Sequence, residues 1–279
     1  MRADLDHLAI AVPSVTDVLP FFAGTLGGAI LAGGPQRGFR GVQCRYANGM
    51  SLELLEPFEA DAHPFLARFL AAHGPGPHHL TFTVPDLRAA LDEVAGWGWT
   101  PVGVRLGPHA WQEAFLHPRQ ALGTVVQLAQ KARPDLEWAD QVPSGQRFRP
   151  PDPAGAAAPA TVARVVMGVR SLAEGERLFA QGLGGELLAR GADDDGVFVD
   201  VGWVGPGRIR LLTPHPGDGE LRRWLGSRPG RVWEVGLAGV AGEGSGEARV
   251  VTVGGTRLRL EGGTGRPAAA DPGLPGTAA

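Results

Sequence analysis

Two histidines occupy the same place in two copies of one strand pattern. The segment Leu-Asp-His-Leu-Ala-Ile-Ala-Val around His7 matches Pro-His-His-Leu-Thr-Phe-Thr-Val around His79. A later strand of each copy carries a polar residue between apolar neighbours at a matching place, Glu53 in the first and Gln127 in the second. Histidine nitrogens, together with carboxylate or amide oxygens, are common ligands of divalent transition metals. The sequence therefore predicts a site for a divalent metal (Co, Mn, Fe, Ni or Zn) whose ligands are His7, Glu53, His79 and Gln127.

The elements that must position these side chains form two units of the order strand, helix and three strands. Apolar residues alternate in the expected strands and recur at helical spacing in the expected helices. In the first unit we expect strands at 5–12, about 28–33, 39–46 and 50–56, with a helix near 15–26. In the second unit we expect strands at 78–84, near 100–106, 111–116 and 123–129, with a helix at 86–96. If the two βαβββ units pack about a pseudo-twofold axis, the four polar side chains converge. His78, one residue before His79, is expected on the opposite face.

The first unit returns in the second half of the chain with an offset of 157 residues. The segment 162–188 aligns with 5–31 without a gap, and a Leu-Gly-Gly stop occurs in both. A fixed offset over such a length indicates duplication rather than chance. Of the second unit only 232–240 and 256–260 return, too close together for a helix and two more strands. The predicted fold class is α+β: tandem βαβββ units form a cup-shaped mixed sheet, duplicated into two domains of which the second is degenerate.

Composition places the domain boundaries. We expect a metal-site domain at 1–131, a linker rich in Pro, Ala and Gly at 132–160, a degenerate domain at 161–262 and a disordered tail at 263–279.

The second half offers an internal comparison for the predicted site. By the offset and the local strand match, the positions of His7, Glu53, His79 and Gln127 are taken there by Arg164, Arg210, Glu234 and Arg259. Three arginines cannot bind a cation, so we expect the second half to have lost the site. An ion-pair cluster and a site for an anion both remain open.

Composition also limits the partners and the compartment. The formal net charge is −3, which argues against a nucleic-acid surface, and no apolar run reaches the ~18 residues of a membrane helix. The single cysteine, Cys44, excludes an internal disulfide and fits a reducing compartment. With no apolar signal region before the first strand, a cytoplasmic protein is expected.

The residues resemble a known group, the vicinal oxygen chelate superfamily, which includes glyoxalase I, extradiol dioxygenases, drug-resistance proteins and methylmalonyl-CoA epimerase. Residues 3–131 are most similar to the epimerase. The segments that carry this resemblance read Leu-Asp-His-Leu-Ala-Ile-Ala-Val from Leu5, Leu-Glu-Leu-Leu-Glu-Pro from Leu52, Gly-Pro-His-His-Leu from Gly76 and Val-Gln-Leu-Ala-Gln from Val126.

The resemblance implies an enzyme in which a divalent metal with open positions chelates neighbouring oxygens of a substrate and stabilises an enolate. An epimerase or isomerase acting next to a carbonyl or thioester is the leading interpretation, with a small-molecule substrate such as an acyl-CoA thioester. Glu53 and Gln127 are the catalytic candidates, and Glu113 and His117 are alternatives for moving a proton. One departure matters, because the epimerases carry glutamate where this chain has Gln127, and an amide cannot act as a general base.

Other interpretations stay open. Two histidines and one carboxylate also suit Fe(II) and dioxygen, which keeps an extradiol-dioxygenase-like enzyme possible beside a glyoxalase-like one. The same fold also serves as a non-catalytic protein that binds a drug or metabolite. The expected partners are small molecules, with no nucleic acid or membrane, and the protein is expected to be a monomer or homodimer.

Overall fold

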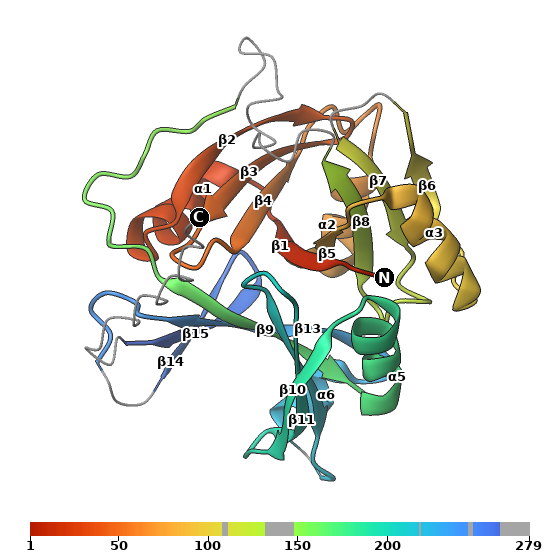
Figure 1. Ribbon diagram of the computed structural model, residues 1–279. Helices are drawn as coiled ribbons and strands as arrows, with labels where there is room; N and C mark the ends of the chain where they lie inside the picture. Colours follow the sequence, from red (N-terminus) through yellow and green to blue (C-terminus); the bar gives the residue numbers. More distant parts are fainter. Residues whose placement is uncertain (108–110, 132–147, 218, 245–247, 263–279) are drawn as a thin grey trace, which may run out of the picture.

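Two mixed β-sheets with few helices make up the structure, a computed structural model (Figure 1). The structure describes residues 1–107, 111–131, 148–217, 219–244 and 248–262. The expected tail and most of the expected linker, 132–147, lie outside the described residues. Within the described ranges, no helix combines the length and the apolar character needed to cross a membrane.

The first sheet has eight strands in the order β2-β3-β4-β1-β5-β8-β7-β6. The central strands β1 and β5 are antiparallel to each other, and each pairs in parallel with the last strand of its own unit, β4 or β8. This pattern is the predicted pair of βαβββ units related by a pseudo-twofold axis. Its elements are β1 (Asp4–Ala11), α1 (Val15–Leu19), η1 (Pro20–Thr25), β2 (Ala29–Gln36), β3 (Phe39–Arg45), β4 (Ser51–Pro57), α2 (Phe65–His73), β5 (Gly76–Thr83), α3 (Leu87–Gly96), β6 (Val102–Arg105), β7 (Trp111–Leu116) and β8 (Val125–Lys131).

The second sheet has seven strands in the order β10-β11-β12-β9-β13-β15-β14. It repeats the first sheet with one strand fewer, and the described residues between β13 and β14 form no helix. The shortened fourth unit was therefore predicted correctly. The elements are β9 (Thr161–Val169), α5 (Leu172–Glu176), η3 (Arg177–Gly182), β10 (Glu186–Ala192), β11 (Gly196–Gly202), β12 (Arg208–Pro214), α6 (Glu220–Leu225), β13 (Gly230–Ala238), β14 (Arg249–Val253) and β15 (Thr256–Glu261).

The described end of the expected linker, 148–160, contains no regular strand or helix. Its one strand-like contact is an isolated bridge between Phe148 and Gly33 of β2. The division of the chain into domains at the expected residues remains a prediction.

The duplication holds at the level of individual residues. Leu8 pairs with Leu52 in the first half, and the residues 157 positions later, Val165 and Ile209, pair in the second. The helices before β2 and β10 are each followed, after one cap residue, by a glycine with positive φ, Gly27 at 66° and Gly184 at 70°. Glycine adopts this left-handed backbone without steric cost, which explains why the Leu-Gly-Gly stop occurs twice.

One apolar core lies between the two halves. Side chains alternate across a strand, so Leu8, Ile10 and Val12 point away from the face that carries His7 and into this core. The ring of Phe82 on β5 packs against second-half rings, 6.2 Å from Phe179 and 5.0 Å from Trp203 between centroids. The largest cluster of buried apolar residues accordingly includes both halves.

The opposite face of each sheet is partly covered by a short helix that the sequence prediction missed. Leu66 of α2 packs on the small residues Ala9 and Ala11 of β1 in the first half. Leu221 of α6 packs on Val166 of β9 in the second half. The apolar pairs of α2 recur at helical spacing, so a signal for this helix was present in the sequence.

Candidate metal centre

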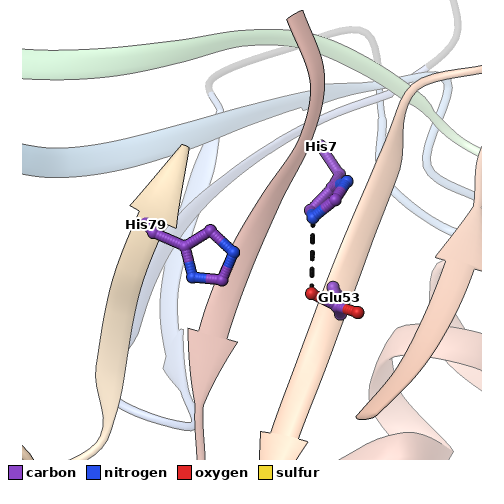
Figure 2. Close-up of side chains that lie close together, drawn as sticks. All are labelled: His7, Glu53 and His79. Carbon is purple, nitrogen blue, oxygen red and sulfur yellow. Dashed lines mark ion pairs between the residues drawn. The ribbon is translucent and has the colours of Figure 1, made fainter. Parts of the chain in front are cut away.

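His7, Glu53 and His79 converge on the face of the first sheet that lies opposite the shared core. Each is buried and offers one ligand atom, and these atoms lie within 4.8 Å of one another. The closest approach joins His7 Nε2 to Glu53 Oε2 at 3.3 Å, and Figure 2 shows a ring nitrogen of His79 directed toward the same space. The convergence follows from strand register, because Glu53 and His79 flank Ala9 on either side, and His7 lies two residues before Ala9 on the same face.

Gln127 is joined to this cluster through Thr81. The Thr81 hydroxyl donates to Gln127 Oε1 at 2.6 Å and lies 2.9 Å from His7 Nε2. Thr81 and Gln127 are paired residues of the parallel strands β5 and β8, and both side chains are buried. The four residues singled out in the sequence thus share one polar cluster, whereas their role as metal ligands remains a prediction.

Asp6 holds the other nitrogen of His7. Asp6 Oδ2 is 2.7 Å from His7 Nδ1, and Asp6 Oδ1 accepts from Lys131 Nζ at 3.0 Å. Burial alone would raise the pKa of Asp6, but the hydrogen bond and charge of His7, with the charge of Lys131, keep this pKa well below its usual range. Asp6 therefore stays ionised and fixes the orientation of the His7 ring.

The cluster attracts a positive charge to His7. Burial acts to lower the pKa of His7, but the charge of Glu53 and the hydrogen bonds that His7 donates to Asp6 and Glu53 outweigh burial and raise this pKa to about 9. At neutral pH and without metal, both ring nitrogens of His7 are therefore protonated. The proton on Nε2 lies between His7 and Glu53, where a bound cation would lie.

His78 lies on the same face as His79, so the expected opposite orientation was wrong. The register of β5 against β1 passes from His79 directly to Pro77, which makes His78 the extra residue of a β-bulge. The Nδ1 atoms of His78 and His79 are 2.8 Å apart, and the His78 ring lies 4.7 Å from that of Phe69 on α2. Burial lowers the pKa of His78 to about 4; burial, with the neighbouring charges of His78 and His7, also lowers that of His79.

The two alternative proton carriers differ in position. Glu113 Oε2 accepts from Gln127 Nε2 at 2.7 Å, and Arg105 pairs with the other oxygen of Glu113 at 2.9 Å. Burial raises the pKa of Glu113 despite the charge of Arg105. His117 is exposed, and its Nδ1 accepts from the backbone N–H of Arg119. Glu113 therefore belongs to the polar cluster, and His117 makes its hydrogen bond within its own turn.

The residues present suit a divalent transition metal. Two imidazoles, one carboxylate and one amide oxygen form a mixed nitrogen and oxygen donor set, which such metals accept. The set is buried and already attracts one positive charge, so a cation would meet prearranged donors. Sequence reasoning missed Asp6, Thr81 and the orientation of His78. Strand alternation could have identified Thr81, because it lies two residues from His79 and therefore on the same face. Asp6 and His78 lie at β-bulges, which the alternation of apolar residues does not reveal.

The second half places charged side chains at the equivalent positions. Strand pairing of Val166 with both Arg210 and Glu234 reproduces the pairing of Ala9 with Glu53 and His79. Arg259 donates to Glu234 at 2.6 Å, and Arg210 binds both oxygens of Asp200 at 2.7 Å. Arg210, Glu234 and Arg259 line a cavity of about 240 Å³ together with Arg164. Of the four residues expected to form an ion-pair cluster, Arg259 and Glu234 pair with each other, whereas Arg210 pairs with Asp193 and Asp200 and Arg164 lies 3.9 Å from Glu261. A site for an anion on this face remains a prediction.

Comparison with known proteins gives matches mainly to the first half. A family described as the glyoxalase/bleomycin resistance protein/dioxygenase superfamily matches residues 6–115. The ethylmalonyl-CoA/methylmalonyl-CoA epimerase of Cereibacter sphaeroides is 32% identical over 136 residues, which cover 47% of this chain and 99% of that protein. The mitochondrial methylmalonyl-CoA epimerase of Homo sapiens is 30% identical over 131 residues, 45% of this chain and 73% of that protein.

A solved structure extends the likeness to both halves. A mutant of 4-hydroxymandelate synthase from Streptomyces coelicolor aligns with a TM-score of 0.61 at 16% identity, over 85% of this chain and 71% of that one. At this identity the match concerns the fold alone, and it agrees with a duplicated arrangement of βαβββ units.

Proposed function

Because the chain belongs to the glyoxalase/bleomycin resistance protein/dioxygenase superfamily, we propose that it is a divalent-metal-dependent epimerase or isomerase acting next to a carbonyl or thioester. The observation that carries this proposal is the convergence of His7, Glu53 and His79, with Gln127 hydrogen-bonded through Thr81. Two relatives are named as epimerases of methylmalonyl-CoA, which favours acyl-CoA thioesters as the substrate class. The expected cytoplasmic location and the monomeric or homodimeric state stay predictions.

His7, Glu53 and His79 would hold the metal, and the amide oxygen of Gln127 would be a fourth ligand. A divalent metal supplies Lewis-acid stabilisation of the negative charge that develops on a carbonyl oxygen when the neighbouring carbon loses a proton. The residues of the chain must then bind the substrate, keep water out and accept that proton.

Two carboxylates are candidates for the proton acceptor. Glu53 faces the centre of the cluster but is also a proposed ligand. Glu113 lies one hydrogen bond away, beyond Gln127, and burial raises its pKa, which improves the match of a general base to neutral pH. If Glu113 accepts the proton, Glu113→Gln keeps the metal and loses activity. If Glu53 has both roles, Glu53→Gln weakens metal binding and activity together.

Elemental analysis followed by an exchange assay tests the function. We expect the purified protein to hold about one equivalent of Co, Mn, Fe, Ni or Zn per chain, in line with one donor set. We also expect the metal-loaded protein to incorporate deuterium from heavy water at the α-carbon of one member of an acyl-CoA thioester panel. His79→Ala is the matched loss-of-site control, and the exposed His117→Ala leaves the metal cluster intact. A protein that takes up none of these metals would overturn the proposal.

The donor set also favours a second candidate function. Two histidines and one carboxylate are the ligands of many non-haem iron oxygenases. A protein that selects iron and consumes dioxygen with a catechol-type substrate, without α-proton exchange, would identify this activity. A metal-loaded protein that binds small molecules and converts none would instead be a binding protein, consistent with an amide rather than a carboxylate at Gln127.

A further inference from the structure

We propose that the residues preceding the two histidines, Asp6 and His78, are positioning residues that present Nε2 of His7 and of His79 to the metal. The inference rests on the proposed function, because it concerns a metal bound at this cluster. Both positioning residues lie at β-bulges, and both contact Nδ1 of the histidine that follows them.

Asp6 reaches His7 only because the strand is irregular there. In a regular strand successive side chains point to opposite faces, so residue 6 would point away from His7. The register between β1 and β5 shifts between Leu5 and His7, and this shift leaves Asp6 as the extra residue. Asp6 Oδ2 then lies 2.7 Å from His7 Nδ1, and Lys131 Nζ holds the other oxygen at 3.0 Å. With Nδ1 engaged, Nε2 is the nitrogen left facing Glu53 at 3.3 Å.

His78 is placed in the same way on β5. The second register shift leaves His78 unpaired, and its Nδ1 lies 2.8 Å from Nδ1 of His79. The ring of His78 is held by contacts with Phe69 and Phe65, at centroid distances of 4.7 and 6.2 Å. If His79 donates from Nδ1, its Nε2 carries a lone pair toward the cluster, which is the tautomer that a metal requires. If His78 donated instead, a proton on Nε2 of His79 would block coordination.

The second half has the same two β-bulges, but the residues at them cannot make the hydrogen bonds that Asp6 and His78 make. Both register shifts recur there, and the extra residues are Ala163 and Trp233. Neither can take the place of Asp6 or His78, since alanine has no polar group and the indole N–H is only a donor. The bulges therefore belong to the shared fold, whereas the groups that hold Nδ1 occur in the half that carries the histidines.

Metal titration of full-length variants tests the inference. We expect Asp6→Ala and His78→Ala each to weaken Zn²⁺ affinity by about 10- to 100-fold, the usual effect of losing a partner of a histidine ligand. Asp6→Asn and His78→Asn keep an oxygen that can accept from Nδ1, so we expect each to recover most of that loss. The exposed Asp92→Asn is the matched charge control, and thermal unfolding of each metal-free variant checks its fold.

Nitrogen-15 NMR of the Zn²⁺-loaded wild-type protein gives a second readout that does not depend on activity. We expect both histidines to show a protonated Nδ1 and a coordinated Nε2. Coordination through Nδ1 would overturn the inference, as would unchanged affinity in both alanine variants while the wild type binds. If the wild type binds none of the metals, the proposed function fails and this inference fails with it. Failure in the variants alone leaves the proposed function standing.

Discussion

The same face of the sheet carries different chemistry in the two halves of the molecule. In the first half, His7, Glu53 and His79 surround Ala9, and the pair of anions Asp6 and Glu53 draws a proton onto His7. In the second half, Arg210 and Arg259 supply fixed positive charge at equivalent positions, and both are bound to carboxylates. Strand register decides where these side chains meet. Residue type decides the source of the positive charge: arginine side chains in the second half, and a proton taken up from solution by His7 in the first.

The largest expected effect is the loss of metal binding when a proposed ligand is replaced by the residue at the equivalent position of the second half. In His7→Arg the guanidinium would occupy the cation space and pair with Glu53, so we expect a loss of metal affinity well above the roughly 100-fold effect of an outer partner. Metal content by elemental analysis and Zn²⁺ titration measure this. Arg164→His is the reciprocal control, and it should leave metal content unchanged. Metal retained by His7→Arg would exclude His7 as a ligand.

The proton on His7 should make metal binding depend on pH. A metal must displace that proton at any pH below the pKa of about 9, so affinity should rise about tenfold per pH unit from neutral pH and level off above pH 9. The His79 pKa lies well below its usual range, so His79 adds no second proton over this range. Zn²⁺ titrations in non-coordinating buffers from pH 6.5 to 8 measure the slope. A flat profile would contradict the charged state of His7.

In the second half the fixed charges should contribute to stability rather than to binding. Glu234 is buried and accepts from Arg257 at 3.0 Å and from Arg259 at 2.6 Å. We expect Glu234→Gln to lower the free energy of unfolding by about 2 kcal/mol, below the 3–5 kcal/mol of a fully buried pair because both arginines are partly exposed. Chemical denaturation of the metal-free protein measures the change. A loss under about 0.5 kcal/mol would show that the ion pairs are as weak as surface pairs.

The smallest expected effect concerns Gln127. Gln127→Glu alone would place two carboxylates 2.7 Å apart, because Gln127 Nε2 now donates to Glu113, so we expect little gain in metal affinity. In the double variant Gln127→Glu with Glu113→Gln, the hydrogen bond is kept and the carboxylate moves to the ligand position. We expect about tenfold tighter Zn²⁺ binding in this variant, an anion at a metal site being worth on the order of 1.4 kcal/mol. Equal affinity of single and double variants would show that Gln127 does not face the metal.

The part of this site that could be predicted from sequence is the part that follows regular strand alternation. His7 and His79 were identified by matching two strands, and the order strand, helix and three strands followed from the apolar periodicity. The degenerate second half followed from the 157-residue offset. Bulges break alternation, so the position of Asp6 was not anticipated and that of His78 was predicted wrongly. Hydrogen bonds such as those of Thr81 depend on the distance between strands, which no single strand encodes.

The apolar core that joins the two sheets makes the halves interdependent. Phe82 lies on the same strand as His79 and touches second-half rings, so a chain that stopped at residue 131 would leave this aromatic surface in water. The second half, which carries arginine and glutamate where the first carries the candidate ligands, therefore still supports the sheet that holds the site. Substitutions at Phe179 or Trp203 would therefore change the packing of the strand that carries His79.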